Sequence, residues 1–398
     1  MELTTVKEAL AIILNNAEDF GIEEVDFLKS MGRVLKENIV ADRDFPPFNR
    51  VSMDGIAFSS EAFNSGQRTF KIEGVQAAGS EQMTLQNKQH CIEAMTGAVL
   101  PNGCDVVIQY ELVTIENGEA TVHLDNVKFF QNIHKKGLDR GANEVLIQKN
   151  TLITSAEIGV LATVGKYKVK VAKQPKVMIV STGNELVEVN ENPAAHQIRR
   201  SNVFTLISIL EKLHIKAETA HILDDKHVLQ TKIEGFLNTY DVFIFSGAVS
   251  KGKFDFIPEV LDNLGVKKLF HKVKQRPGKP FWFGKKANKT VFAFPGNPVS
   301  TFVSCLKYFT PWYQKSMGVT FENSQQAILS EDFFFKPGLT YFLQVKLAQQ
   351  NGKLIATPVT GKGSGDLVNL VDADAFIELP ADKANFSKGE VFPVISYR

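Results

Sequence analysis

Three short apolar runs, each followed by a loop of small residues, constrain the fold of this chain more than any other feature of its sequence. The runs cover residues 177–180, 242–245 and 291–294, and the loops begin at Thr182, Ser246 and Pro295. Short apolar runs bounded by glycine or proline are typical of buried strands. Because ligands bind beyond the carboxyl ends of the strands in an open α/β sheet, we expect the three loops to line one crevice.

Segments with helical periodicity alternate with these strands along the chain. Helices are expected at residues 201–213, 226–237, 256–264 and 298–313, and strands begin near residues 177, 216, 241, 268 and 291. Strands and helices that alternate in this way form βαβ units, which produce a mostly parallel sheet. We therefore predict a central α/β domain over residues 177–318.

Three further domains are predicted around the central one. The apolar spacing over residues 4–15 indicates an amphipathic helix, and residues 1–45 and 136–176 are expected to form one discontinuous N-terminal domain. Pro46 and Pro47 separate its first part from residues 46–135, whose short alternating runs predict a small inserted β domain. Residues 319–398 contain similar runs and predict a small β barrel. The fold class is thus multidomain α/β plus β.

Composition excludes several classes of function. The chain has 398 residues and a net charge of +1, which gives no reason to expect nucleic acid or an anionic membrane as a partner. No apolar run approaches the roughly 20 residues that a membrane helix needs. The three cysteines are few and odd in number, which favours a reducing compartment. We expect a cytoplasmic protein.

A basic stretch with a rigid turn is the clearest charge feature. No acidic residue occurs between Asp262 and Glu322, whereas lysine and arginine are frequent there. Within it, Arg276 and Lys279 belong to a turn that contains two prolines and a glycine. One interpretation is that these lysines form an ordinary solvated surface without a binding role. We favour a site for phosphate or another oxyanion, which arginine binds as a fork and lysine as a point charge.

Acidic residues follow the same predicted strands. Glu185 lies after the first loop, Asp224 and Asp225 end the strand near residue 219, and Asp255 lies after the second loop. Carboxylates beside a phosphate site suggest Mg²⁺. Alternatively, Asp225 caps the helix that begins at residue 226, and Glu185 accepts from a loop amide.

Several small or polar residues complete the candidate site. Glycines such as Gly183, Gly247 and Gly296 let the backbone approach an anion and present its N–H groups. The sequence has neither a Walker lysine motif nor a GxGxxG fingerprint. Asp54 precedes a glycine and Thr96 lies at a second turn; for both, simple turn chemistry is the alternative.

Six motifs resemble those of the molybdopterin molybdenumtransferase family. They are SMDG at 52–55, MTGA at 95–98, STGNEL at 181–186, SGAVSKGKFD at 246–255, RPGKP at 276–280 and PGNPVS at 295–300. They occur in the family's order and cover nearly the whole chain. The set as a whole is specific, although each motif alone is weak.

The resemblance implies an activity and an assembly. It implies an elongated homodimer that inserts molybdate into adenylylated molybdopterin, releases AMP and needs Mg²⁺, with residues 1–45 and 136–176 as the linker and dimerisation domain. The central domain would be of the molybdopterin-binding type. The site would lie between this domain and the inserted β domain of the partner subunit. A molybdopterin adenylyltransferase is a further expected docking partner.

The resemblance also assigns roles to individual residues. The polar and metal-side residues would be Asp54, Thr96, Glu185, Asp225 and Asp255, with the last three on the metal. The substrate and the anion would be bound by Gly183, Ser246, Gly247, Ser250, Lys272, Arg276, Lys279, Pro295, Gly296, Asn297 and Ser364.

This chain departs from the family pattern at three positions. Ala248 replaces a usual glycine, Asn184 replaces a usual aspartate, and Gln344 is neutral where a basic residue is frequent. The choice between Asp224 and Asp225 as the metal ligand is open. Two other functions also stay open. One is a nucleotide pyrophosphatase or adenylyltransferase with the same central fold, and the other is a non-enzymatic dimeric scaffold.

Overall fold

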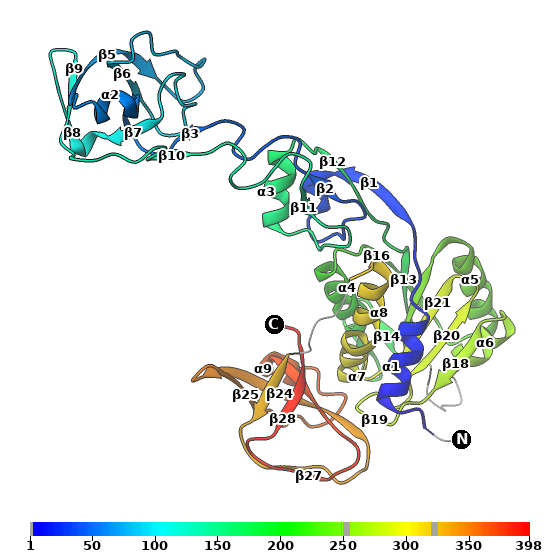
Figure 1. Ribbon diagram of the computed structural model, residues 1–398. Coiled ribbons are helices and arrows are strands. Elements are labelled where there is room, and N and C mark those ends of the chain that lie inside the picture. The colour runs from blue at the N-terminus through cyan, green and yellow to red at the C-terminus, as the bar shows by residue number, and fades with distance from the viewer. Residues whose placement is uncertain (1–2, 248, 250–254, 320–324) are drawn as a thin grey trace. The chain divides into compact units, whose positions relative to one another are not determined.

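The computed structural model describes residues 3–247, 249, 255–319 and 325–398, which group into two compact units. The first unit contains Met1–Lys36, Asn150–Thr154 and Lys168–Arg398, and the second contains Glu37–Lys149 and Ser155–Tyr167. Figure 1 shows their helices and strands and labels most of them. In the described part of the chain, every helix is too short or too polar to cross a membrane. The finer division into four domains stays a prediction.

The first unit is built on a six-stranded sheet. Its order is β16 (Ala217–Ile222), β13 (Val177–Thr182), β17 (Val242–Ser246), β21 (Lys289–Phe294), β20 (Trp282–Lys286) and β18 (Lys267–His271). The first four strands are parallel, and the last two pair antiparallel. The prediction of a mostly parallel central sheet is therefore confirmed, whereas β20 was not predicted.

Helices cover both faces of this sheet. Side chains alternate along a strand, so Ile179 packs toward one face and Val180 toward the other. The first face is covered by α1 (Val6–Asn15), α4 (Asn202–Lys212), α7 (Pro298–Ser304), a π-helical turn (Cys305–Phe309) and α8 (Thr310–Met317). The second is covered by α5 (Lys226–Thr239) and α6 (Ile257–Asn263). Since both faces are covered, each residue of β13 is buried.

The N-terminal part of the first unit joins this domain through α1 and a strand pair. Thr5 begins α1 with a capping box, in which its side chain accepts from the Glu8 N–H and the Glu8 carboxylate accepts in return. The predicted amphipathic helix is therefore confirmed. Strand β1 (Ile22–Asp26) precedes a 3₁₀ turn (Phe27–Ser30) and pairs antiparallel with β12 (Lys168–Ala172). The short strands β14 (Leu186–Val187) and β15 (Ile198–Arg199) also pair with each other.

The C-terminal part of the first unit is a closed barrel, as predicted. Five strands form the ring, β24 (Thr340–Gln350), β25 (Lys353–Pro358), β22 (Gln326–Leu329), β28 (Val391–Ser396) and β26 (Ala375–Leu379), and β26 pairs again with β24. A strand pair, β23 (Phe333–Phe334) and β27 (Asn385–Phe386), and the short helix α9 (Asn369–Asp372) complete it. Strand β19 (Gln275–Arg276) of the basic turn pairs with β24. This pairing attaches the basic turn to the barrel.

The second unit contains the predicted small β domain. Its sheet has the order β7 (Val106–Gln109), β4 (Gly55–Phe58), β6 (His90–Ala94), β5 (Thr69–Gln76), β9 (Glu119–Val122) and β8 (Val113–Glu116). The remaining elements are α2 (Ser60–Asn64), a 3₁₀ turn (Tyr110–Leu112), α3 (Ser155–Thr163), the pair β3 (Arg50–Val51) and β10 (Ile133–His134), and the pair β2 (Ile39–Val40) and β11 (Val145–Ile147). Two small apolar clusters form its core.

Candidate functional site

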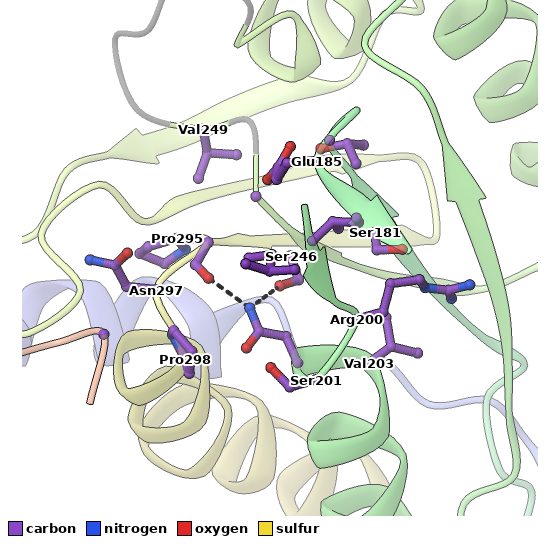
Figure 2. A pocket seen from close by; sticks show the side chains of 18 of the residues that line it. Ser181, Glu185, Arg200, Ser201, Val203, Ser246, Val249, Pro295, Asn297 and Pro298 are labelled. Atoms are coloured by element: carbon purple, nitrogen blue, oxygen red, sulfur yellow. Dashed lines mark hydrogen bonds between the residues drawn. The ribbon is translucent and has the colours of Figure 1, made fainter. Parts of the chain in front are cut away.

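A cavity of about 690 Å³ lies beyond the carboxyl ends of β13, β17 and β21. The three loops that follow these strands line it, as the sequence predicted. Figure 2 shows Glu185, Ser246 and Asn297 from these loops around the cavity. The predicted residues in its wall are Gly183, Glu185, Ser246, Gly247, Asp255, Pro295, Gly296 and Asn297.

Two of these loops are compact enough to require glycine. Gly183 has φ +136°, and a Cβ at this position would lie 2.5 Å from the Glu185 carboxylate. Gly247 has φ +106°, and its Cβ would lie 3.3 Å from the Thr182 carbonyl oxygen. L-residues rarely adopt either backbone conformation. Glycine therefore lets Glu185 fold back over its own loop and lets the second loop approach the first.

Asn202 connects two of the loops, although no sequence motif indicated this residue. Its Nδ2 donates to the Ser246 Oγ at 2.9 Å and to the Gly296 carbonyl at 2.7 Å, which are the dashed lines of Figure 2. Asn202 is the first residue of α4, so the helix holds its amide against the strand ends. The polar residues 199–202, which lead into this helix, were the sequence feature that could have indicated Asn202.

The acidic residues divide between the cavity and a helix cap. Glu185, Asp224 and Asp255 line the cavity, whereas Asp225 does not. The Asp225 carboxylate accepts from the N–H groups of His227 and Val228, at 2.9 Å each, and caps α5. The geometry thus matches the capping alternative for Asp225, and Asp224 is the acid of this pair that lines the cavity; which of the two acts on a metal stays a prediction.

Asp224 lies in an environment that opposes its charge. Burial raises the pKa of its carboxyl above the usual value, and the neighbouring charges of Glu185 and Asp255 raise it further. Asn184, one of the departures from the family pattern, positions this residue, because its Oδ1 accepts from the Asp224 N–H at 3.0 Å. A bound cation would relieve the repulsion among the three acids.

These acids suit a magnesium ion that shares its ligands with a substrate. Among the described residues, no group of three acidic, histidine or cysteine side chains is arranged so that it could hold a metal ion by itself. Mg²⁺ usually keeps several waters and binds one or two carboxylates together with substrate phosphates. An incomplete set of carboxylates around a cavity fits that pattern.

A second cavity of about 520 Å³ adjoins the first and is lined only by cations among its charged residues, whereas the first holds Arg199 and Arg200 beside its three acids. Its wall includes Arg276, Lys279, Lys362, Ser300 and Ser364, and it contains no acidic side chain. The two cavities share Pro280, Pro295 and Asn297. Asn297 Nδ2 donates to Ser364 Oγ at 2.7 Å, which ties the third loop to the barrel.

Three lysines of the basic stretch form ion pairs with acids elsewhere in the chain. Lys285 pairs with Glu18, Lys289 with Asp241, and Lys307 with Glu378. Lys272 lines neither of the two cavities; it lies at φ +76°, and its N–H donates to the Phe281 carbonyl at 2.9 Å. The role of Lys272 on the anion therefore stays a prediction. Ser250 and Ala248 lie outside the described residues.

In the second unit, Asp54 and Thr96 come together although 42 positions separate them. The Thr96 N–H donates to Asp54 Oδ1 at 2.6 Å. This bond and the Thr96 hydroxyl hold the pKa of the exposed Asp54 carboxyl below its usual value. Asp54 is thus a fixed, ionised surface carboxylate beside a threonine, which goes beyond an isolated Asp-Gly turn.

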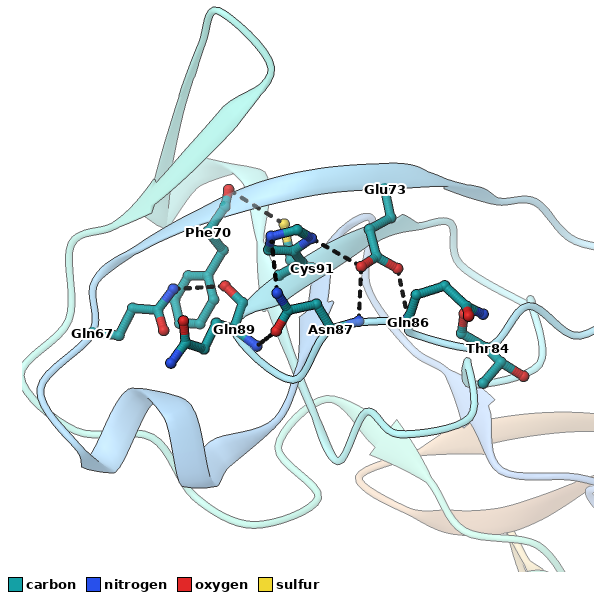
Figure 3. A network of polar contacts seen from close by, with 9 residues as sticks. Gln67, Phe70, Glu73, Thr84, Gln86, Asn87, Gln89 and Cys91 are labelled. Carbon is teal, nitrogen blue, oxygen red and sulfur yellow. Dashed lines mark hydrogen bonds and ion pairs between the residues drawn. The ribbon is translucent and has the colours of Figure 1, made fainter.

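The second unit also contains a polar network around Glu73 (Figure 3). The Glu73 carboxylate accepts from the N–H groups of Gln86 at 2.7 Å and Asn87 at 3.0 Å. His90 Nδ1 lies 2.9 Å from the same carboxylate. Although burial opposes the charge, these backbone donors and His90 hold the pKa of Glu73 below its usual value.

Comparison with known proteins agrees with this geometry over the whole chain. Family models described as MoeA N-terminal region (domain I and II), probable molybdopterin binding domain and MoeA C-terminal region (domain IV) match residues 4–165, 178–315 and 326–397.

Relatives and solved structures also match along the full length. A molybdopterin molybdenumtransferase of Synechocystis is 38% identical over 403 residues, covering 99% of this chain and 100% of the relative. One of Staphylococcus epidermidis is 31% identical, covering 98% and 95%. A molybdopterin biosynthesis MoeA protein of Pyrococcus horikoshii has a TM-score of 0.84 at 30% identity, with both chains fully covered. The chain therefore belongs to the molybdopterin molybdenumtransferase (MoeA) family of molybdenum cofactor biosynthesis enzymes.

Proposed function

We propose that this protein inserts molybdate into adenylylated molybdopterin and releases AMP. The observation that carries the proposal is the pair of adjoining cavities, which share Asn297 and two prolines. The wall of the first, the acidic cavity, holds three acids and two arginines, and the wall of the second, the basic cavity, holds three cations and no acid. Cleavage of a phosphoanhydride beside the tetrahedral molybdate dianion needs acids that bind a cation and basic residues that bind the anion. Both must lie within reach of one substrate.

The acidic cavity is the proposed place of Mg²⁺ and of the substrate phosphates. One or two of Glu185, Asp224 and Asp255 would bind the ion together with the substrate phosphates. When bound, the ion would offset the negative charge that develops on the leaving AMP. The residues of this chain orient the reacting groups: Asn202 fixes two loops, and Asn184 positions Asp224.

The basic cavity is the proposed molybdate site. Arg276 offers a planar fork of donors and Lys279 a point charge, both suited to a tetrahedral oxyanion. Ser364 Oγ already accepts from Asn297, so its own hydrogen is available to donate. Ser300, which was not predicted, is 2% exposed and belongs to the same wall.

The homodimer, the shared site and the cytoplasmic location are part of the same proposal. Asp54 and Thr96 are proposed to complete the active site of the partner subunit, because they form an ordered polar pair on an exposed turn. Docking of an adenylyltransferase would deliver the adenylylated substrate. The three cysteines are free, which suits a reducing compartment.

The deciding experiment measures AMP released from adenylylated molybdopterin by the whole protein. We expect release that requires both molybdate and Mg²⁺ and stops on chelation of the metal. AMP release without molybdate would instead indicate a nucleotide pyrophosphatase. No release under any of these conditions would indicate a scaffold.

A further inference from the structure

Lys362 is a charged residue of the basic cavity that neither the motifs nor the proposed function has used. It lies on the loop of residues 361–365, between β25 and α9 of the barrel. We infer that Lys362 is the barrel's charged contribution to anion binding, beside Ser364 of the same loop, and makes the cavity selective for doubly charged tetrahedral oxyanions. The inference rests on the proposed function, because it names a further residue of the same anion site.

The loop holds Lys362 in a defined place. Its N–H donates to Asp366 Oδ2 at 2.9 Å, which closes the loop on the C-terminal side. A Cβ at the preceding Gly361 would lie 2.8 Å from Asn369 Nδ2, so the backbone there packs directly against Asn369. The lysine therefore extends from an anchored segment.

The neighbouring barrel strand offers the cavity no charge. Gln344 of β24 is 8% exposed, and its Oε1 accepts from Asn369 Nδ2 at 3.0 Å. With its oxygen engaged, Gln344 retains only its neutral amide N–H groups for the cavity. Asn369 thus fixes both Gln344 and the backbone at Gly361, and Lys362 is the only charged residue that the barrel adds to the described wall.

The charge balance explains why the third cation matters. Arg276 and Lys279, both of the central domain, would together neutralise a dianion such as molybdate. With no acid in the wall, Lys362 gives the cavity an excess of positive charge. Coulomb energy scales with the product of the charges, so this excess favours a dianion about twice as strongly, in free energy, as a monoanion of the same shape.

Perrhenate provides the matched probe, because it is tetrahedral like molybdate but carries one negative charge. Calorimetric titration of the whole protein with each inorganic anion measures the two dissociation constants directly. For Lys362→Met, which keeps the length of the side chain, we expect molybdate to bind about tenfold more weakly and perrhenate about threefold more weakly. For Lys362→Arg we expect molybdate selectivity to be kept.

Lys353→Met is the matched control, since Lys353 is an exposed lysine of the same barrel outside the cavity. It should leave both constants unchanged. Higher ionic strength should reduce the difference between wild type and Lys362→Met, because the effect is electrostatic.

Three outcomes would overturn the inference. They are unchanged molybdate binding in Lys362→Met, an equal loss for both anions, and wild-type protein that binds neither anion. The titration is independent of turnover. If Lys362→Met loses molybdate selectively while wild type releases no AMP from the adenylylated substrate, the anion site stands and the proposed transferase function fails.

Discussion

Glu73 in the inserted β domain and Asp224 in the central domain are both half-buried acids, yet their pKa values shift in opposite directions. Glu73 receives two backbone N–H groups and faces His90. Asp224 receives weaker support, from Asn184 and His221, and faces Glu185 and Asp255. The donors stabilise the charge of Glu73, whereas burial and like charges destabilise that of Asp224.

The difference distinguishes an acid that holds a fold from one that awaits a ligand. The Glu73 network closes within one domain and joins the segment of residues 84–90 to β5. Both acids line a cavity, but at Asp224 the neighbouring carboxylates of Glu185 and Asp255 leave negative charge that a cation would offset. Perturbed acids in clefts are characteristic of functional sites, and satisfied acids are characteristic of structural ones.

The largest expected effect, on the rate of AMP release, comes from replacing two neighbouring acids one at a time. Asp224→Asn removes a carboxylate of the acidic cavity, and we expect the rate of AMP release to fall about 100-fold or more, as for other electrostatic contacts to a transition state. Asp225→Asn retains a good helix cap, because asparagine and aspartate are equivalent there, and should stay within about twofold of wild type. The measurement is initial AMP release at saturating molybdate.

The reverse result would contradict the assignment of Asp224 as the functional acid. If Asp225→Asn lost activity and Asp224→Asn retained it, the residue that caps α5 would be the functional acid. Similar losses in both variants would mean that the segment needs both acids for its conformation.

Glu73→Gln is expected to affect local stability and leave turnover intact. The N–H groups of Gln86 and Asn87 would lose a charged acceptor, so hydrogen exchange in residues 84–90 should accelerate about tenfold. The folded pKa of Glu73 is lowered, so this protection should be complete above about pH 4.5 and disappear as the pH falls through the lowered value. Glu119→Gln, at an exposed position of the same sheet, should change neither exchange nor turnover. A large loss of AMP release in Glu73→Gln would assign Glu73 to the site.

The strand-end loops were predictable because their positions follow from local patterns. Apolar runs of four residues locate parallel strands, and all parallel strands present their carboxyl ends at one edge. Gly183, Ser246 and Asn297 consequently meet in one cavity although more than a hundred residues separate the first from the last. Strand β20 was missed because its residues follow the basic turn, and its apolar run is only three residues long before Gly284.

Contacts between distant segments could not be predicted from one sequence. The partner of Lys285 is Glu18, which lies 267 residues earlier in the sequence. The basic stretch therefore looked more strongly charged in the sequence than it is on the folded surface. The choice between Asp224 and Asp225 depends on a one-residue register at the end of β16, and such a shift reverses the direction of a side chain. Lys362 was not predicted as a site residue, because a lysine in a glycine-rich loop is usually solvated.

The smallest expected effect is on the stability of the Asp224→Asn variant. Because the folded pKa of Asp224 is raised above 3.8, wild type loses stability as the pH rises from 3.8 through the folded value, and the ionised group is a net cost at pH 7. The neutral variant avoids this cost and should melt slightly higher at pH 7. The gain should stay below about 0.5 kcal/mol, since solvent screens a partly exposed group. It should vanish below pH 3.8, where wild type is protonated as well. Mg²⁺ should raise the melting temperature of wild type more than that of Asp224→Asn, because only wild type has all three acids whose charge the ion would offset. An equal effect of Mg²⁺ on both proteins would remove Asp224 from the proposed metal site, and Asp224 would then be an unfavourable acid without a ligand.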